Sequence, residues 1–271
     1  MIHKYILLLL FIFVSIIFLI LCYCWWCKSN KNIIDTNINN NNKIPKTIHQ
    51  TYPTKNVNKD IQNNIDTLKR LNPGYEYRLY DDNDIIKFIK NNYDDYILET
   101  YNKINPEYGP ARSDYFRYLL LYKEGGVYLD IKSSCEKPFN SIIKNDDEYI
   151  LTHWGIPGIA HNDILNNEYG EYCNWNIIIK KNHPLMKKII DQITFNINNY
   201  SIQEYGVGKP GVLLLTGPIS YSKVIIKNKD KYNITLYSNY YDIGLIYSII
   251  ENHDKLYKKH YSKLDTPIVL N

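Results

Sequence analysis

The chain has 271 residues, 45% of them hydrophobic, and a formal net charge of +4 at pH 7. This length and apolar share are enough to bury one sizeable core, so one folded domain is the simplest expectation. The charge is small, and no long Lys/Arg run carries interleaved aromatic residues, which excludes nucleic acid as the expected partner.

Residues 1–27 predict a membrane anchor. Between residues 5 and 27 only Ser15 is clearly polar, and a helix of this length spans about 35 Å, enough to cross a lipid bilayer. The run ends in Trp25-Trp26 without an Ala-x-Ala exit, which favours a retained anchor over a cleaved signal peptide. The Asn-rich stretch 28–43 cannot bury enough apolar area to fold, so it predicts a flexible stem before a folded domain at 44–271.

Alternating strand and helix patterns open the folded domain. Asp81 or Asp84 can cap the helix that runs to Lys90, because a carboxylate accepts hydrogen bonds from first-turn N–H groups. The expected elements are a strand that begins at Ile44 and ends in a turn at Pro53, a helix at 60–71, a strand at 75–80, the helix ending near Lys90, and a further helix within 91–108.

The most informative stretch is 109–138. Pro110 can begin a helix because its missing N–H has no intrahelical partner there, and Gly125-Gly126 supplies the positive φ that ends one. The apolar face of this helix consists of Tyr115, Tyr118, Leu119 and Tyr122. Asp114 and Arg117, three residues apart, project together from another face. They could act as one functional unit, or form an ordinary ion pair on a helix surface.

A short buried strand, Val127 to Leu129, follows the glycines and ends on Asp130. In open α/β sheets ligands bind at the carboxyl ends of strands, where this acid would lie. Asp130 could hold a divalent cation, or could be a strand-end acid paired with Lys132 or a backbone N–H. Because successive strand residues alternate faces, Asp130 and Lys132 are expected to point the same way.

The second half of the chain gives fewer signals. Cys135 and Cys173 could pair in an oxidising lumen or remain free thiols in the core. The loop at 155–170 is a fair place for acceptor recognition, and the glycine-rich stretch 206–217 lacks the Walker pattern of a phosphate-binding loop. The expected elements are strands at 149–152 and 174–180 and a helix from Leu185 to about Phe195.

The 109–138 stretch resembles glycosyltransferase family 32, which includes initiating α-1,6-mannosyltransferase, and more distantly the glucosylating domains of large clostridial toxins. The shared features are a helix that carries a Ser-Asp-x-x-Arg motif, whose arginine is Arg117 here, a Gly-Gly-x-Tyr-x-Asp strand motif whose acid is Asp130, and a second acid two residues later, where this chain has Lys132. The resemblance implies an α/β fold of the GT-A type with a mixed, mainly parallel central sheet, preceded by one N-terminal transmembrane helix. It also implies a single-pass, type II membrane protein with a luminal, Golgi- or ER-like catalytic domain.

The resemblance further implies a glycosyltransferase that moves a hexose from a nucleotide-sugar donor to a glycan or glycoprotein acceptor, with retention of configuration. Donor cleavage places charge on the leaving phosphate oxygens, which an acid-held Mn²⁺ or Mg²⁺ commonly stabilises. Either Asp130 and His260 hold this ion together with diphosphate oxygens, or Lys132 neutralises the diphosphate itself. The residue at 132 also leaves open a catalytically degenerate domain that binds glycans or acts as a scaffold.

By the same resemblance, the expected catalytic residues are Asp130, Asp114 and Arg117, the last two through contacts with donor sugar hydroxyls and phosphate. The opening strand carries Ile-His-Gln-Thr before Tyr52, as family members carry it before an aromatic residue that can lie against the base. A strand with a buried histidine is the alternative there, and a solvated histidine is the alternative for His260. The expected donor-binding residues are His49, Gln50, Tyr52, Asp114, Arg117, Tyr128 and Lys132, and the expected metal ligands are Asp130 and His260.

Overall fold

The computed structural model of the chain describes residues 43–155, 158–165, 167–168, 170–250 and 261–270. The expected anchor at 1–27, the expected stem up to residue 42 and the candidate metal ligand His260 lie outside these residues. Across the described ranges, none of the helices has both the length and the apolar character that crossing a membrane requires.

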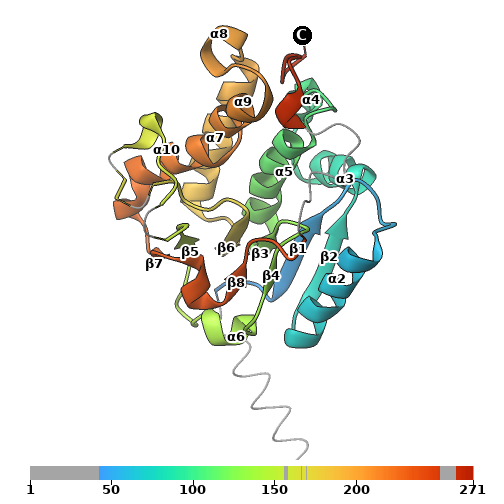
Figure 1. Cartoon of the computed structure of the whole chain (residues 1–271), viewed down its shortest axis with the longest axis vertical. Helices are drawn as coiled ribbons and strands as arrows, with labels where there is room; N and C mark the ends of the chain where they lie inside the picture. The colour runs from blue at the N-terminus through green and yellow to red at the C-terminus, as the bar shows by residue number, and fades with distance from the viewer. Residues whose placement is uncertain (1–42, 156–157, 166, 169, 251–260, 271) are drawn as a thin grey trace, which may run out of the picture. The chain divides into compact units, whose positions relative to one another are not determined.

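A six-stranded sheet with the order β2-β1-β3-β6-β5-β7 forms the centre of the fold (Figure 1). Only β6 runs against the other strands, since it pairs antiparallel with both β3 and β5 while the remaining pairs are parallel. The sheet is therefore mixed and mainly parallel, as the sequence predicts. Its strands are β1 (Thr47–Thr51), β2 (Glu76–Tyr80), β3 (Gly126–Leu129), β5 (Tyr149–Thr152), β6 (Asn176–Ile179) and β7 (Thr235–Tyr237).

A second, two-stranded sheet joins β4 (Ser134–Cys135) to β8 (Leu245–Ile246) in antiparallel pairing. It brings the segment after β3 next to a segment more than a hundred residues later. The helices of the fold are α2 (Lys59–Leu71), α3 (Asp82–Asn92), α4 (Asp95–Lys103), α5 (Gly109–Glu124), α6 (Phe139–Ile142), α7 (Pro184–Asn198), α8 (Ile202–Tyr205), α9 (Gly208–Leu215) and α10 (Pro218–Asn228). Short 3₁₀ helices are η1 (Asn162–Ile164), η2 (Lys229–Lys231), η3 (Tyr240–Ile243) and η5 (Tyr261–Lys263).

The strands alternate side chains between two hydrophobic clusters, one on each face of the sheet. Tyr128 and Ile177 face a cluster built with α3, α4, α5, α7, α9 and α10, whereas Val127 and Ile178 face a cluster built with α2, α6 and the β4–β8 ribbon. The result is a layered α/β arrangement with helices on both faces (Figure 1). Cys135 and Cys173 belong to the second cluster as free, buried thiols.

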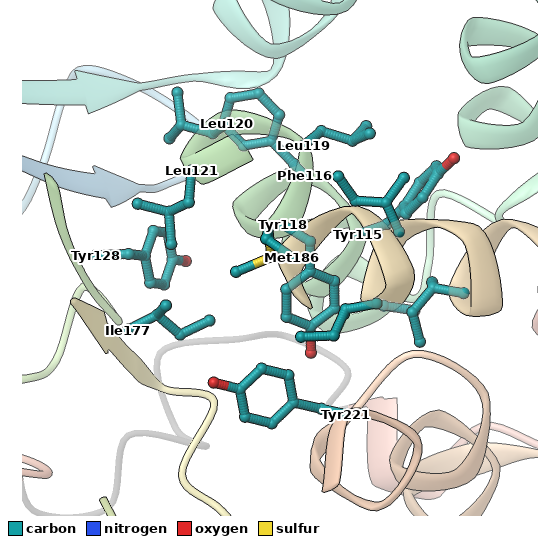
Figure 2. Packing of buried hydrophobic residues seen from close by; sticks show 14 of the residues in the cluster. Tyr115, Phe116, Tyr118, Leu119, Leu120, Leu121, Tyr128, Ile177, Met186 and Tyr221 are labelled. Atoms are coloured by element: carbon teal, nitrogen blue, oxygen red, sulfur yellow. The ribbon is translucent and has the colours of Figure 1, made fainter. Parts of the chain in front are cut away.

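Helix α5 lies deeper in the protein than its sequence pattern predicts. Besides Tyr115, Tyr118 and Leu119 of the expected apolar face, the side chains of Phe116, Leu120 and Leu121 are fully buried and those of the charged pair are almost completely buried, whereas Tyr122 is partly buried. Figure 2 shows Tyr118 and Leu121 on the side of α5 that faces Tyr128 of β3 and Met186 of α7, whereas Phe116 and Leu120 lie on the opposite side of the helix. A helix enclosed on nearly all sides has no solvated face, so a periodic pattern read as amphipathic underestimates its burial.

The two glycines after α5 are needed for a close passage of the main chain. Gly125 has φ +65° and Gly126 has φ +98°. A Cβ at Gly125 would lie 2.6 Å from the Lys181 nitrogen, and one at Gly126 would lie 2.6 Å from the Thr47 carbonyl oxygen. Because both conformation and space exclude a side chain, only glycine lets α5 lead directly into β3.

Helix α9 is the clearest element that the sequence pattern does not predict. Gly208, Pro210 and Gly211 all count against a helix on propensity alone. The structure shows why Gly211 is accepted, since a Cβ there would lie 2.6 Å from Ile268 Cδ1 and 3.0 Å from the Gly206 main chain. Close packing between segments, rather than local propensity, stabilises this helix.

Both candidate caps of α3 are used, in a reciprocal capping box. Asp81 Oδ1 accepts from the Asp84 N–H at 2.9 Å, and Asp84 Oδ2 accepts from the Asp81 N–H at 3.2 Å. Replacing Asp81 with alanine leaves one first-turn donor unsatisfied, so we expect a loss of about 1 kcal/mol in the free energy of unfolding. Urea denaturation measures it. Asp81→Asn, which keeps an acceptor, is the control and should stay within a few tenths of a kcal/mol of the original.

Candidate functional site

Three charged side chains meet at the carboxyl end of β3. Arg117 Nη2 lies 3.3 Å from Asp114 Oδ1 and 3.0 Å from Asp130 Oδ1, so one guanidinium nitrogen bridges both carboxylates. The side chains of Asp114 and Arg117 are only 8% and 5% exposed, whereas that of Asp130 is 26% exposed. The ion network is therefore buried at its base and opens to solvent at Asp130. The i,i+3 pair expected from the sequence is present, but in the interior rather than on a helix surface.

Hydrogen bonds and an aromatic ring hold the Arg117 guanidinium in place. Its Nη1 donates to the Asn174 carbonyl oxygen at 2.6 Å, its Nε donates to the Ser113 carbonyl oxygen at 3.3 Å, and its guanidinium carbon lies 4.6 Å from the centre of the Tyr128 ring. Each of its three nitrogens thus contacts at least one protein acceptor. Arg117 therefore contacts both carboxylates and does not present a free fork.

Asp114 connects the charged network to the second half of the chain. Its Oδ1 accepts from Asn174 Nδ2 and its Oδ2 accepts from Thr216 Oγ1, each at 3.1 Å. Tyr118, one turn further along α5, accepts from the same Asn174 amide at 3.0 Å and donates to the Thr216 carbonyl oxygen at 3.0 Å. Burial raises the pKa of Asp114 to about 6, although Arg117 and these hydrogen bonds oppose the shift.

The main chain at Asp130 is also held. Gln50 Nε2 donates to the Asp130 carbonyl oxygen at 2.9 Å, and Tyr77 donates to Gln50 Oε1 at 2.8 Å. The Ser133 N–H bonds to the same Asp130 carbonyl at 2.8 Å, which closes a turn over 130–133. Gln50 is completely buried and therefore holds the main chain of Asp130 from inside the protein, at the carboxyl end of β3.

Lys132 lies in this turn, so the expectation that it shares a strand face with Asp130 is wrong. Strand β3 ends at Leu129, and strand alternation does not extend to residue 132. The Lys132 ammonium donates to Tyr247 Oη at 2.8 Å and lies 4.1 Å from the centre of the Tyr247 ring. Asp130 and Lys132 thus face different partners, one on α5 and one on the segment after β8.

The other expected donor-binding residues take different places. His49 is completely buried, with Nε2 3.0 Å from the Gly125 carbonyl oxygen and Nδ1 3.2 Å from Tyr80 Oη, and burial lowers its pKa to about 4. His49 is therefore a buried histidine within a strand, the alternative to donor binding that the sequence left open, and it does not reach the surface of the site. Tyr52, partly buried, directly follows β1, and Tyr128 is buried beneath Arg117 with its hydroxyl 3.0 Å from Thr51 Oγ1.

Asn174 and Thr216 are site residues that sequence reasoning missed. Asn174 precedes β6 and Thr216 ends α9, yet both bind Asp114 directly. Thr216 falls within the glycine-rich stretch 206–217, to which sequence reasoning assigns no chemistry. The Asn-rich composition of the chain hides Asn174 among many solvated asparagines.

The described residues do not fit a resident divalent ion. Among them there is no cluster of three or more His, Cys, Asp or Glu side chains that could hold a metal. Asp130 is engaged by Arg117, and the neighbouring position that would carry a second acid carries Lys132. Mg²⁺ and Mn²⁺ prefer several carboxylate or other oxygen ligands, so this donor set is poor for either.

Comparison with known proteins agrees with the position of the site. Residues 58–149 match the family described as glycosyltransferase sugar-binding region containing DXD motif, a range that includes Asp114, Arg117 and Asp130. Together the sheet-edge site and this match define the class, an α/β protein with a glycosyltransferase sugar-binding region. Within that class the chain is related to glycosyltransferase family 32, as the sequence predicts.

Individual relatives match parts of the chain. It is 35% identical over 100 residues to the mannosyl phosphorylinositol ceramide synthase SUR1 of Saccharomyces cerevisiae, covering 37% of this chain and 25% of that protein. It is 23% identical over 190 residues to the initiation-specific alpha-1,6-mannosyltransferase of the same yeast, covering 56% and 39%. The solved structure PaToxG Glycosyltransferase aligns with 74% of this chain and 78% of its own at a TM-score of 0.49 and 20% identity. The chain spans less than half the length of these two curated relatives.

Proposed function

We propose that this protein is a GT-A-type glycosyltransferase that transfers a hexose from a nucleotide-sugar donor to a glycan or glycoprotein acceptor with retention of configuration. The observation that carries the proposal is the Asp114–Arg117–Asp130 network, which opens to solvent at the carboxyl end of β3 within the matched sugar-binding region. Ligands of open α/β sheets bind at this edge. Because both yeast relatives are named for mannose transfer, GDP-mannose is the first donor to test.

Each residue of the network has a distinct part in this proposal. Asp130, the most exposed of the three, accepts hydrogen bonds from donor hydroxyls through the carboxylate oxygen that Arg117 does not bind. Asp114 and Arg117 keep that carboxylate in one orientation, which lowers the entropic cost of seating the sugar. The sequence analysis expects all three residues to touch the donor. In this proposal only Asp130 does so, and Asp114 and Arg117 position it.

The sequence expectation of Mn²⁺ or Mg²⁺ at Asp130 and His260 does not enter this mechanism. Asp130 is matched by Arg117, and His260 lies outside the described residues. We also propose, from the apolar run at 5–27, that the protein is anchored in a bilayer as a type II protein with its catalytic domain on the luminal side.

The function is tested by donor hydrolysis. Purified full-length protein is incubated with GDP-mannose, UDP-glucose, UDP-galactose and UDP-N-acetylglucosamine, and free nucleoside diphosphate is measured. We expect at least one donor to be cleaved, and Asp130→Asn to lower that rate at least tenfold by removing a charged acceptor at the sugar. An unchanged rate in Asp130→Asn would contradict the assigned site. The matched control Asp146→Asn changes an exposed acid in the turn before β5 and should leave the rate unaltered.

A catalytically degenerate domain is the second candidate, and Lys132 is the observation that favours it. In that case a nucleotide sugar or a glycan binds without being cleaved. Calorimetric titration with the same donors separates the two functions, since binding with no release of diphosphate over several hours supports the degenerate domain and sustained release supports the enzyme.

A further inference from the structure

A buried carboxylate contacts a partly exposed histidine between β5 and β6 in the chain. Glu171 Oε2 lies 2.8 Å from His161 Nε2, and Glu171 Oε1 accepts from Trp154 Nε1 at 2.7 Å. The side chain of Glu171 is only 6% exposed, whereas that of His161 is 21% exposed. The acid is thus held in the interior with a partner at each oxygen, and its histidine partner reaches the surface.

Stability alone is a poor reason for this arrangement. Taking a carboxylate out of water costs free energy that a buried ion pair often does not recover, so such a pair is weak evidence for a stabilising role. Other ion pairs of this protein, such as Lys187 with Asp191, lie at the surface and avoid that cost. The buried position of Glu171 therefore directs attention to what His161 does.

Local contacts hold the His161–Glu171 pair together. The Glu171 N–H donates to the Ile159 carbonyl oxygen at 2.9 Å, which keeps the main chain just before His161 beside the acid. Asp163 Oδ1 accepts from Lys223 Nζ at 2.7 Å, which joins η1, the short helix that follows His161, to α10. The pair is therefore formed before any ligand arrives, as a binding site that pays little ordering entropy requires.

The pair belongs to the same edge of the sheet as Asp130. Strand β6 runs antiparallel to both β3 and β5, so β3 and β5 point the same way and end at one edge. Neighbouring strands lie about 4.8 Å apart, so the ends of β3 and β5, with β6 between them, are about 10 Å apart. Trp154 follows β5 and Glu171 precedes β6, which places both at this edge, where ligands of open α/β sheets bind.

Hydrogen bonds and ring contacts connect the pair to Asp130. The Asp130 N–H donates to the Trp175 carbonyl oxygen at 2.9 Å. The ring centres of Trp175 and Trp154 are 6.2 Å apart, and both rings lie edge-on to Tyr247, at 5.3 Å and 4.7 Å. Because Trp154 donates to Glu171, this aromatic cluster joins the end of β3 to the pair, and its Trp154 and Tyr247 side chains are partly exposed.

The contact with Glu171 determines what the second ring nitrogen of His161 can bind. An ionised carboxylate only accepts hydrogen bonds, so Nε2 carries a proton and the neutral imidazole keeps its lone pair on Nδ1. Nδ1 can then accept a hydrogen bond from a hydroxyl group. Ligand sites combine aromatic side chains with a few placed polar groups. A neutral sugar, with apolar faces and many hydroxyl groups, fits this combination.

We propose that His161, oriented by Glu171, binds a hydroxyl group of a neutral acceptor sugar through Nδ1 and so contributes to the choice of acceptor. The inference rests on the proposed function and deepens it by naming side chains that recognise the acceptor. Glu171 is a positioning residue that acts through His161, and Trp154 is one that acts through Glu171.

The first test compares transfer with hydrolysis in the full-length protein. The donor that the protein hydrolyses is supplied with methyl α-mannopyranoside, methyl β-glucopyranoside or methyl β-galactopyranoside, and the disaccharide and the free sugar are both measured. We expect at least one glycoside to be used. His161→Gln should raise its KM about 3- to 10-fold, as the loss of one hydrogen bond does, and lower the ratio of disaccharide to free sugar accordingly.

Glutamine is chosen because its amide nitrogen stands as far from Cβ as Nε2 does, so the bond to Glu171 is kept and only Nδ1 is lost. An unchanged KM and ratio in His161→Gln would overturn this inference and leave the proposed function intact. Hydrolysis of a donor with no disaccharide from any of the three glycosides would contradict a neutral acceptor sugar. If no donor is hydrolysed, the proposed function fails, and this inference with it.

The second test separates ligand binding from folding. In His161→Asn, the amide oxygen stands as far from Cβ as Nδ1 does, so an acceptor for the sugar is kept, but the side chain no longer reaches Glu171. We expect a lower melting temperature than in His161→Gln, because a buried carboxylate oxygen loses its partner, and a KM nearer to the original. A KM that is raised more in His161→Asn than in His161→Gln would show a purely structural pair and contradict the proposal.

The third test changes the positioning residue. In Glu171→Gln the amide oxygen must face Trp154 Nε1, which only donates, so the amide N–H faces His161 and the imidazole proton moves to Nδ1. Nδ1 then donates instead of accepting, and we expect the KM of the glycoside to rise. An unchanged KM would contradict orientation by Glu171. The control Glu168→Gln removes an exposed acid between β5 and β6 and should leave the KM and the product ratio unaltered.

Discussion

Replacing Arg117 with methionine is expected to lower the free energy of unfolding by about 3–5 kcal/mol, because it leaves two carboxylates without their shared counter-charge. Asp114 is buried, and one guanidinium nitrogen bridges it to Asp130. The substitution also orphans the Asn174 carbonyl oxygen and removes the cation from the Tyr128 ring. Chemical denaturation of full-length protein, followed by tryptophan fluorescence, measures the loss.

A companion variant identifies the cause of that loss. If the unpaired charges are responsible, adding Asp114→Asn and Asp130→Asn to Arg117→Met should recover a substantial part of the lost stability, since no buried charge then remains uncompensated. If the triple variant is as unstable as, or less stable than, the single one, lost packing of the guanidinium explains the effect instead. Arg117→Lys should not rescue, because one ammonium cannot reach Asp114, Asp130 and the Asn174 carbonyl together.

The sequence predicts the local elements of this site because each has a local cause. Pro110 and the two glycines bound α5, and the structure confirms the reason for the glycines in the positive φ at both positions. The helical spacing of Asp114 and Arg117 brings them together whatever else the chain does, and their 3.3 Å contact follows from it. The same holds for the capping box at the start of α3.

What the sequence does not predict depends on contacts between distant segments. Asn174 and Thr216 reach Asp114 across 60 and 102 residues, and Tyr247 reaches Lys132 across 115. The sequence left two roles for Lys132 because a strand pattern would have put it beside Asp130. A turn closed by Ser133 instead directs it to Tyr247. No period or motif specifies such a pairing, because it comes from the β4–β8 ribbon.

We expect the fall in activity at low pH, the acid limb of the pH–rate profile, to follow the protonation of Asp114. Burial raises its pKa to about 6, so the carboxylate is ionised at pH 7 and becomes protonated as the pH falls through 6. A protonated Asp114 no longer attracts Arg117, and the bridge that orients Asp130 loosens. We therefore expect the rate of donor hydrolysis to fall about tenfold for each pH unit below 6, as it does when one ionisation controls a step.

The contribution of Asp114 to the free energy of unfolding should rise as the pH falls, although the activity falls. This difference distinguishes protonation of Asp114 from general unfolding by acid. The pKa of Asp114 is raised in the folded state above its ordinary value of 3.8, so folded protein binds this proton more readily than unfolded protein. The contribution of Asp114 to stability is therefore larger at low pH and declines as the pH rises from about 4 to about 6. As the pH falls from about 6 to about 4, we therefore expect the activity to fall while the contribution of Asp114 to the free energy of unfolding rises.

Two variants test the assignment of this acid limb. The hydrogen bond from Thr216 opposes the raised pKa of Asp114, so Thr216→Val should move the midpoint of the acid limb to higher pH. Asp114→Asn carries no titrating group, so its reduced rate should be flat between pH 5 and 7. A midpoint unmoved in Thr216→Val, together with an acid limb that persists in Asp114→Asn, would assign the limb to another residue. A shifted midpoint in Thr216→Val and a flat profile in Asp114→Asn would support control of the partly exposed Asp130 by the buried Asp114 through Arg117.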